Sequence, residues 1–279
     1  MITWDRLAVR QEAARLRLGL DPRQRREGAG ARLGAGPGAS LEFHDHRAYQ
    51  PGDDLRHLDW AASARTGGLV LRRHRKEVLP RLEILIDGSA SMDAHPGKLA
   101  LAVGLAALIA SLADDEALRP QVHWCGATPV RLASAWEPSL ATQVAGGAAG
   151  FSAQLPGLIA GADRLLVSDG LCPEGGPAVI RRLGAGAGRI SLIQVLSREE
   201  LIPPADGPGR LEDVEGGFTD LHRDATVIAS YRERLARHQA GWASALAGRG
   251  AGVVTVAVED GWRPAIRALL RAGLVTTAC

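Results

Sequence analysis

Apolar residues follow two alternating patterns over residues 81–279. Short runs that are apolar almost throughout are typical of strands buried on both faces of a sheet, and they occur at residues 82–86, 120–125, 163–168, 189–196 and 252–258. Stretches with apolar residues at helical spacing separate these runs, at residues 98–113, about 153–160, 177–184, 224–247 and 262–272. Strands that alternate with helices predict βαβ units. We therefore expect an α/β fold with a doubly wound, mostly parallel sheet in this part of the chain.

The N-terminal part has a different pattern. Residues 3–18 place apolar side chains at near-helical spacing among charged ones, which predicts an opening amphipathic helix. Residues 27–39 are rich in glycine, as flexible links are. Residues 41–78 favour short strands and turns, with Gly67-Gly68 joining two hairpin arms. Two domains are therefore expected, an N-terminal extension at residues 1–80 and an α/β domain at residues 81–279.

Composition and charge narrow the class of protein. Of the 279 residues 46% are hydrophobic and 23% are charged, which is ordinary for a globular protein and excludes a disordered chain. The formal net charge of +2 is too small for a polycation, although residues 1–81 hold 16 Lys and Arg against 10 Asp and Glu. A nucleic-acid-binding module that uses this basic extension is one alternative. Aromatic residues make up only 4% and offer no stacking platform, so no nucleic-acid partner is expected.

The cysteines and the longest apolar run bear on the compartment. Cys125, Cys172 and Cys279 are odd in number and widely spaced, so the sequence shows neither a disulfide framework nor a zinc ribbon, and a reducing cytoplasm is favoured. The apolar run at residues 99–112 is shorter than the ~20 residues of a membrane span. The N-terminus has no secretory signal pattern. We expect a cytoplasmic protein without a membrane span.

Polar residues follow two of the predicted strands at the point where each ends. Asp87, Ser89 and Ser91 come after the first strand, and Asp169 follows another. Because ligands bind beyond the carboxyl ends of parallel strands, we expect these residues to lie together at one edge of the sheet. Small polar residues are also ordinary at strand-to-helix turns, so a structural role as turn or cap is the alternative.

The pattern Asp-x-Ser-x-Ser, followed about 80 residues later by Ser-Asp, resembles the metal-ion-dependent adhesion site of von Willebrand factor A domains. The resemblance implies that Ser89 and Ser91 ligate Mg²⁺ or Mn²⁺ and that Asp87 and Asp169 hold its waters. Mg²⁺ prefers octahedral oxygen ligands, and one position would stay free for a carboxylate from another protein. The family supplies a Thr from a third loop, and here Ser152 is the candidate substitute. Thr142 and Ser139 are the alternatives.

A second resemblance covers residues 41–78, which are similar to the signature of the bacterial family called domain of unknown function 58. The residues that carry it are Arg47, Tyr49, Pro51, Gly52, Asp53, Asp54, Asp59, Trp60 and Arg65. Such proteins are typically associated with MoxR-type AAA+ ATPases. This resemblance implies an adaptor that binds such an ATPase and an unknown client protein. Within the signature, Asp53, Asp54, Arg56 and Asp59 are expected to form a charge network that fixes the extension on the main domain, with Trp60 buried beneath it.

An enzyme is the main rival. Haloacid-dehalogenase phosphatases need a second Asp two residues after the first, and Ser89 occupies that place after Asp87. No Gly-x-Ser-x-Gly motif indicates a serine hydrolase. His44 and His46 have no third ligand nearby in sequence and are expected to be surface histidines. We therefore expect a metal-dependent protein-binding module that is not an enzyme, with a phosphatase-like hydrolase as the alternative.

Overall fold

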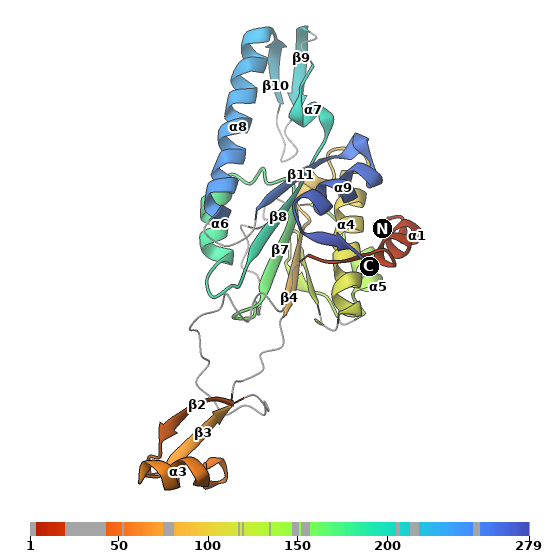
Figure 1. Ribbon diagram of the computed structural model, residues 1–279. Coiled ribbons are helices and arrows are strands. Elements are labelled where there is room, and N and C mark those ends of the chain that lie inside the picture. Colours follow the sequence, from red (N-terminus) through yellow and green to blue (C-terminus); the bar gives the residue numbers. More distant parts are fainter. Residues whose placement is uncertain are drawn as a thin grey trace. The chain divides into compact units, whose positions relative to one another are not determined.

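The computed structural model (Figure 1) describes residues 4–19, 43–51, 53–74, 81–116, 118, 120–133, 135–146, 151, 157–204, 207–212, 218–247 and 252–278. The chain divides into two compact units. The main unit combines Met1–Leu20 with Pro80–Cys279, and the second unit is Asp21–Leu79. Each unit is described by itself below.

The main unit is built on a six-stranded sheet with the strand order β11-β8-β7-β4-β5-β6. The strands are β4 (Leu82–Asp87), β5 (Gln121–Cys125), β6 (Val130–Arg131), β7 (Asp163–Ser168), β8 (Ile190–Leu196) and β11 (Val253–Ala257). All neighbours are parallel except β5 and β6, which are antiparallel. Every residue of β4, β7 and β8 is buried, which explains their uninterrupted apolar pattern. The predicted α/β fold with a mostly parallel sheet is confirmed.

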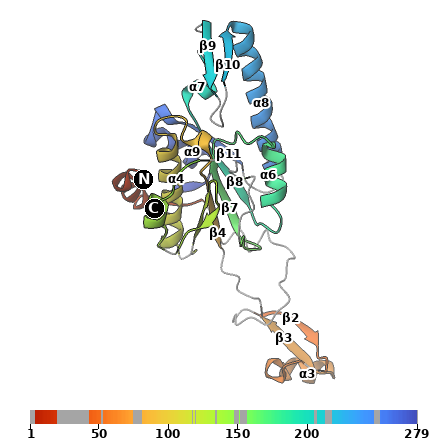
Figure 2. The same cartoon turned by 180° about the vertical axis from the view of Figure 1, so that it is seen from behind.

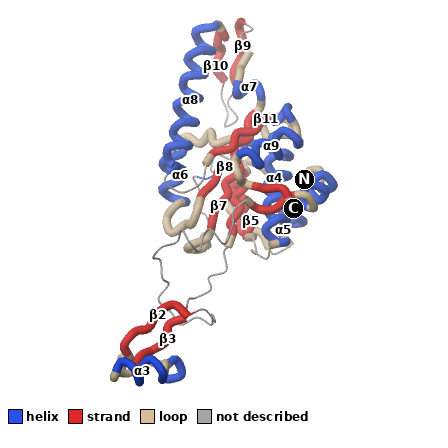
Figure 3. The backbone as a smooth tube through the Cα atoms, viewed as in Figure 1, coloured by secondary structure: helices blue, strands red, loops and turns tan. Residues whose placement is uncertain are grey.

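Helices cover both faces of this sheet (Figures 1 and 3). They are α1 (Arg6–Ala13), α4 (Lys98–Asp115), α5 (Trp136–Ala141), α6 (Gly175–Leu183), α8 (Ala225–Ala247) and α9 (Trp262–Arg271). Ile84 and Ile86 of β4 belong to the core that includes residues of α1, α4, α5 and α9. Leu85 lies in the other core, with residues of α6 and α8. Alternate residues of one strand thus fill two separate cores, as the two-residue period of a strand requires.

The opening helix belongs to the main unit, not to the extension, so the predicted boundary at residue 80 is wrong for residues 1–20. α1 packs on α4, and its Val9 and Ala13 are buried in the same core. The helix is also shorter than expected, because the chain continues as β1 (Leu16–Leu18), which pairs antiparallel with β12 (Val275–Thr277). The apolar side chains that predicted an amphipathic helix are buried against distant parts of the chain, and this places them in the main unit.

The second unit holds two antiparallel strands, β2 (Phe43–Ala48) and β3 (Val70–His74), with η1 (Leu55–His57) and α3 (Trp60–Thr66) between them. Gly67 does not join hairpin arms. It ends α3 at φ 71°, in the left-handed region that glycine adopts without strain. The Asp59 side chain begins the same helix by accepting a hydrogen bond from the Ala62 backbone N at 3.0 Å. α3 is therefore defined by its two caps.

The remaining described elements lie after β4, β8 and β11. They are η2 (Ala90–Met92), α7 (Arg198–Leu201), β9 (Gly207–Glu212), β10 (Phe218–Arg223) and η4 (Val258–Asp260). β9 and β10 pair antiparallel beside α8, as Figure 2 shows from behind. Of the helix expected at about 153–160, residues 153–156 lie outside the described residues, and residues 157–160 form turns and coil, so the prediction is wrong for that half. In the described part of the chain, no helix is long and apolar enough to cross a membrane.

Candidate functional site

Asp87 occupies the carboxyl end of β4, between β7 and β5 in the sheet, and is 4% exposed. Its Oδ1 accepts a hydrogen bond from the Ser89 backbone N at 2.9 Å, and its Oδ2 accepts one from Ser168 Oγ at 2.5 Å. The next residue must be small, since a Cβ on Gly88 would lie 2.3 Å from the Trp124 ring. The strand ends of β4 and β7 are thus joined through the Asp87 carboxylate.

Ser89 and Ser91 present their hydroxyls to each other at the start of η2. The two Oγ atoms are 3.1 Å apart, and Ser89 does not use its side chain to cap η2. Neighbouring oxygens of an octahedral Mg²⁺ site, each about 2.1 Å from the ion, are about 3 Å apart. The serine pair therefore has the spacing of two adjacent ligands of one hard divalent ion.

Asp169 is 1% exposed and lies next to a fully buried ammonium group. Lys98 Nζ donates to Asp169 Oδ2 at 2.9 Å, to Glu200 Oε1 at 2.7 Å and to the Ser91 carbonyl oxygen at 3.1 Å. The other Asp169 oxygen accepts a hydrogen bond from the Leu171 backbone N at 2.9 Å. Lys98 thus connects the loops that follow β4, β7 and β8.

Burial and charge determine the protonation of the groups at this edge. Loss of hydration, and then the nearby Asp169 carboxylate, raise the pKa of Asp87 to about 6. Burial is also the main reason why the pKa of the Cys125 thiol lies well above its ordinary value. The buried thiol therefore stays protonated and is a poor nucleophile. A cation beside Asp87 would favour the ionised form of the Asp87 carboxyl group.

Four of the predicted metal-site residues lie in the described part of the chain, and the structure brings them together: Asp87, Ser89, Ser91 and Asp169. Ser152 lies outside the described residues. Thr142 Oγ1 donates to the Ser139 carbonyl oxygen at 2.8 Å, at the end of α5. Within the described ranges, no group of three or more His, Cys, Asp or Glu side chains is placed to hold a metal. The serine hydroxyls would have to be ligands of any metal ion at this place, and their spacing of 3.1 Å fits two ligands of one ion.

Ser168, Lys98 and Glu200 are site residues for which sequence reasoning assigned no role. Lys98 is one of only two lysines in the chain and begins the very apolar helix α4, which was a signal that could have been used. Ser197 and Glu200 form a capping box at α7, whose Ser-x-x-Glu spacing is visible in the sequence. The contact between Glu200 and Lys98 gave no such signal, because the two residues are 102 positions apart.

The signature residues of the second unit pair among themselves. Arg47 donates to Asp53 at 2.6 Å and lowers the pKa of that carboxyl. Asp59 contacts His46 Nε2 at 2.8 Å in addition to capping α3. Trp60 is 69% exposed, so the prediction that it is buried is wrong. Trp60 is the first residue of α3, whose N-cap is Asp59, so the helix backbone fixes its position, and its ring is not part of a hydrophobic core. Among the remaining signature residues, the Tyr49 backbone N donates to the Leu69 carbonyl oxygen, and the Asp54 side chain pairs with Arg56. Pro51 and Arg65 are exposed, and Gly52 lies outside the described residues.

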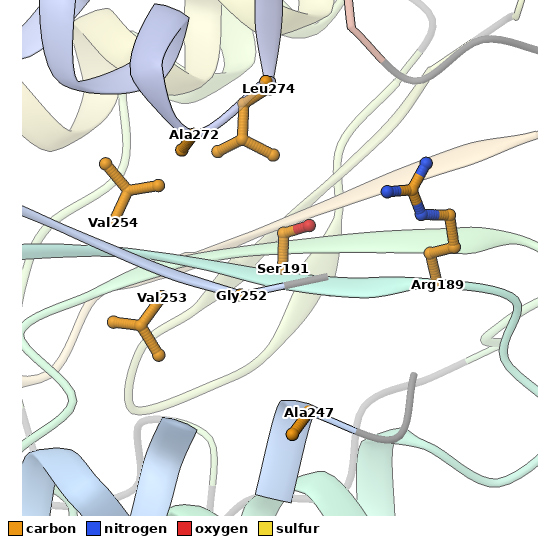
Figure 4. Close-up of a pocket in the computed structure, with 9 residues that line it drawn as sticks. Arg189, Ser191, Ala247, Gly252, Val253, Val254, Ala272 and Leu274 are labelled. Carbon is orange, nitrogen blue, oxygen red and sulfur yellow. The ribbon is translucent and has the colours of Figure 1, made fainter. Parts of the chain in front are cut away.

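A separate pocket of about 290 Å³ lies at the opposite, amino-terminal edge of β8 and β11. Arg189 and Ser191 are among its lining residues, together with Val254 and Leu274 (Figure 4). None of the Asp87, Ser89, Ser91 or Asp169 side chains lines it. This pocket is therefore distinct from the cluster at the carboxyl ends of the strands.

Residues 45–126 match the family model described as "Protein of unknown function DUF58". The match overlaps the signature of the second unit, where the resemblance to this family was found, and it includes the Asp87 loop. The uncharacterized proteins Rv1480 of Mycobacterium tuberculosis and Mb1516 of Mycobacterium bovis are each 29% identical over 273 residues, which cover 90% of this chain and 86% of theirs.

Two solved structures are also similar. One is the conserved hypothetical protein BatB from Bacteroides thetaiotaomicron, at 17% identity over 69% of this chain and 96% of that one, with a TM-score of 0.34. The other is an aerotolerance-related membrane protein from Bacteroides fragilis, at 18% identity over 70% of this chain and 98% of that one, with the same TM-score of 0.34.

Proposed function

We propose that the carboxyl edge of the sheet binds a divalent metal ion and, through it, a carboxylate of a partner protein. The observation that carries the proposal is the pair of serine hydroxyls 3.1 Å apart beside the buried Asp87. Ser89 and Ser91 would hold Mg²⁺ or Mn²⁺ directly, in the manner of a von Willebrand factor A domain. When bound, the ion would supply an electrophilic position for an incoming carboxylate oxygen.

The charge at this edge favours a cation. Asp87, Asp169 and Glu200 carry three negative charges when ionised, and Lys98 is the one basic side chain paired with any of them in the described part of the chain. The formal sum is about −2 in a largely buried place, where an uncompensated charge is costly. A divalent ion would neutralise that sum.

Exposed apolar side chains on the surrounding loops favour a protein as the partner. Val144 is 75% exposed, Ile202 59% and Leu171 38%. Leu171 donates its backbone N to Asp169, and the Val144 loop approaches the site through the hydrogen bond from Gly146 N to the Gly88 carbonyl oxygen at 2.9 Å. One metal-bridged carboxylate is too small for a stable interface, which buries about 800 Å² per partner, and these side chains would add apolar area.

The contacts also argue against the rival enzyme functions. Asp87 is 4% exposed and joins the ends of two strands through its two oxygens, which favours a supporting role over attack on a phosphoryl group. Over the residues that the structure describes, neither serine hydroxyl is hydrogen-bonded to a histidine that could activate it. A binding module therefore fits the site better than a hydrolase.

The partner that we propose is a MoxR-type AAA+ ATPase, for which this chain would act as an adaptor toward a client protein. The support is the family resemblance of the second-unit signature, combined with a metal site that has a position left for an acidic side chain. The proposed adaptor would use the site loops for docking.

Calorimetric titration of Mg²⁺ and Mn²⁺ into chelator-treated full-length protein tests the metal site. We expect binding by the wild type, a loss of at least about tenfold in affinity for the Ser89→Ala/Ser91→Ala variant, and no change for Ser244→Ala, an exposed serine of α8, as the matched control. Absence of binding by the wild type at millimolar ion would contradict the proposal.

Capture of the ATPase tests the adaptor role. Immobilised wild type should retain the ATPase in Mg²⁺, and both EDTA and Asp87→Ala should reduce retention several-fold while circular dichroism shows an unchanged fold. If the wild type retains no ATPase, the partner is wrong. If retention ignores both EDTA and Asp87→Ala, docking does not use the metal.

A further inference from the structure

We infer that Lys98 is a positioning residue that keeps the proposed metal site open to an outside carboxylate, because its ammonium group holds Asp169 and Glu200 away from the ion. This inference rests on the proposed metal site and deepens it. It concerns how many ligands the chain itself gives to the ion.

The ammonium group of Lys98 is fully buried, and each of its N–H donors has an acceptor. Its side chain is 0% exposed, and its three N–H donors have three acceptors, on Asp169, Glu200 and the Ser91 backbone. A buried charge is tolerated only with such complete partners, so the position of the group is fixed. Lys98 is also the first residue of α4, where the helix backbone holds it in place.

The two carboxylates have every oxygen engaged. Asp169 Oδ2 faces Lys98 and Oδ1 faces the Leu171 backbone N. Glu200 Oε1 faces Lys98, and Oε2 accepts a hydrogen bond from the Ser197 backbone N at 2.7 Å. Asp87, in contrast, has hydrogen bonds but no cationic side chain against it in the described residues. Only one of the three acids thus keeps its charge available for a metal.

This distribution controls what a bound ion can do. Carboxylate oxygens are preferred ligands of hard divalent ions, so a released Asp169 or Glu200 would enter the coordination shell and fill a position. The ion would then be held more tightly, but it would have less remaining charge and one fewer exchangeable water. With Lys98 in place, the ion keeps both for a partner.

Removal of the Lys98 charge should therefore raise the affinity for the metal and lower the number of exchangeable waters on the bound ion. In Lys98→Met we expect the Kd for Mn²⁺ to fall by about tenfold or more, and the relaxation enhancement of water protons by bound Mn²⁺ to fall, because fewer waters exchange on the ion. A purely structural role for Lys98 would instead weaken Mn²⁺ binding in that variant.

A matched pair guards against misfolding of Lys98→Met, in which two buried carboxylates lose their partner. Glu200→Gln keeps the pair between Lys98 and Asp169 and is the reference for the double variant, because both variants lack the Glu200 charge. Lys98→Met/Glu200→Gln releases Asp169 alone and should bind Mn²⁺ at least about fivefold more tightly than Glu200→Gln, with lower water-proton relaxation. All variants are the full chain, checked by circular dichroism.

Equal or weaker Mn²⁺ binding in both Lys98 variants, with the fold retained, would overturn the inference. The outcome is separable from that of the proposed function. If the wild type binds no Mn²⁺ but the Lys98 variants do, the proposed function fails and the role of Lys98 stands. If none binds, both fail.

Discussion

At the scale of single residues, Asp87 is a buried carboxyl group, 4% exposed, that no basic side chain pairs with in the described part of the chain. Its pKa of about 6 lies above the ordinary 3.8, because burial and the Asp169 carboxylate disfavour ionisation in the folded state. A raised pKa gives a contribution to stability that is complete below about pH 4 and is lost as the pH rises through 6. The two pKa units correspond to about 3 kcal/mol. The ionised Asp87 is therefore a cost to the metal-free protein at neutral pH.

Asp87→Asn should remove that cost. In EDTA we expect the variant to be more stable than the wild type by about 1–3 kcal/mol at pH 7.5 and nearly equal to it at pH 3.5. The amide oxygen can still accept from the Ser89 backbone N, so the turn keeps its hydrogen bond. Urea unfolding followed by circular dichroism measures the difference. A stability difference that is the same at both pH values would show that Asp87 is not the group that titrates.

At the scale of elements, α8 holds the loop that carries Asp169. The Trp242 ring N donates to the Gly170 carbonyl oxygen at 2.9 Å, and His238 contacts the same oxygen. Trp242 can lie this close to α6 because Gly176 has no side chain: a Cβ there would be 2.6 Å from the Trp242 ring and 2.9 Å from its Cα. The position of the site loop therefore depends on one glycine in the helix packed beneath α8.

Two glycine substitutions in these helices should have opposite effects. Gly176→Ala should destabilise the protein by about 1–3 kcal/mol, because the added methyl group would overlap with Trp242. Gly241→Ala should stabilise it by about 0.5–1 kcal/mol, because its Cβ would meet only Pro177 Cδ at 3.8 Å in the interior of α8. Thermal unfolding of the two variants checks both signs. Equal effects would mean that α6 and α8 do not approach each other this closely.

At the scale of the whole molecule, the main unit is assembled from both ends of the chain. Residues 1–20 and 80–279 form one unit, and residues 21–79 form another between them. The buried Val9, Ala13, Leu16 and Leu18 join the core built around α4. The main unit should therefore fold without the second unit, and it should lose much of its stability without its own first 20 residues.

Two deletions test this division. Replacement of residues 21–79 by a flexible linker of about 15 residues should preserve the far-ultraviolet circular dichroism of the main unit and its cooperative unfolding. Deletion of residues 1–20 should lower the free energy of unfolding by several kcal/mol, on the order of 5, because buried apolar side chains are lost. If the second deletion proves harmless, α1 and β1 are accessory to the main unit.

The sequence predicted those parts of the fold whose signals are local. The buried strands were visible as apolar runs. Because parallel strands end at the same edge of a sheet, the end of each strand then placed Asp87 near Asp169. α3 was missed because its apolar pattern is weak, although its caps, Asp59 and Gly67, were readable. The ion pairs of Lys98 could not be predicted, since its partners are 71 and 102 residues away and no local pattern specifies them.

The pairing of β1 with β12 has a consequence for synthesis on the ribosome. In the described part of the chain β12 is the one partner of β1, and Leu16 pairs with Thr277. At ~5–20 residues per second, translation from the first of these residues to the second takes roughly 15–50 seconds. Throughout that interval the nascent chain presents β1 as an unpaired strand edge, a target for holding chaperones. A chain that stops before β12 leaves β1 permanently unpaired, so the exposed edge of β1 should make truncated products sensitive to proteolysis.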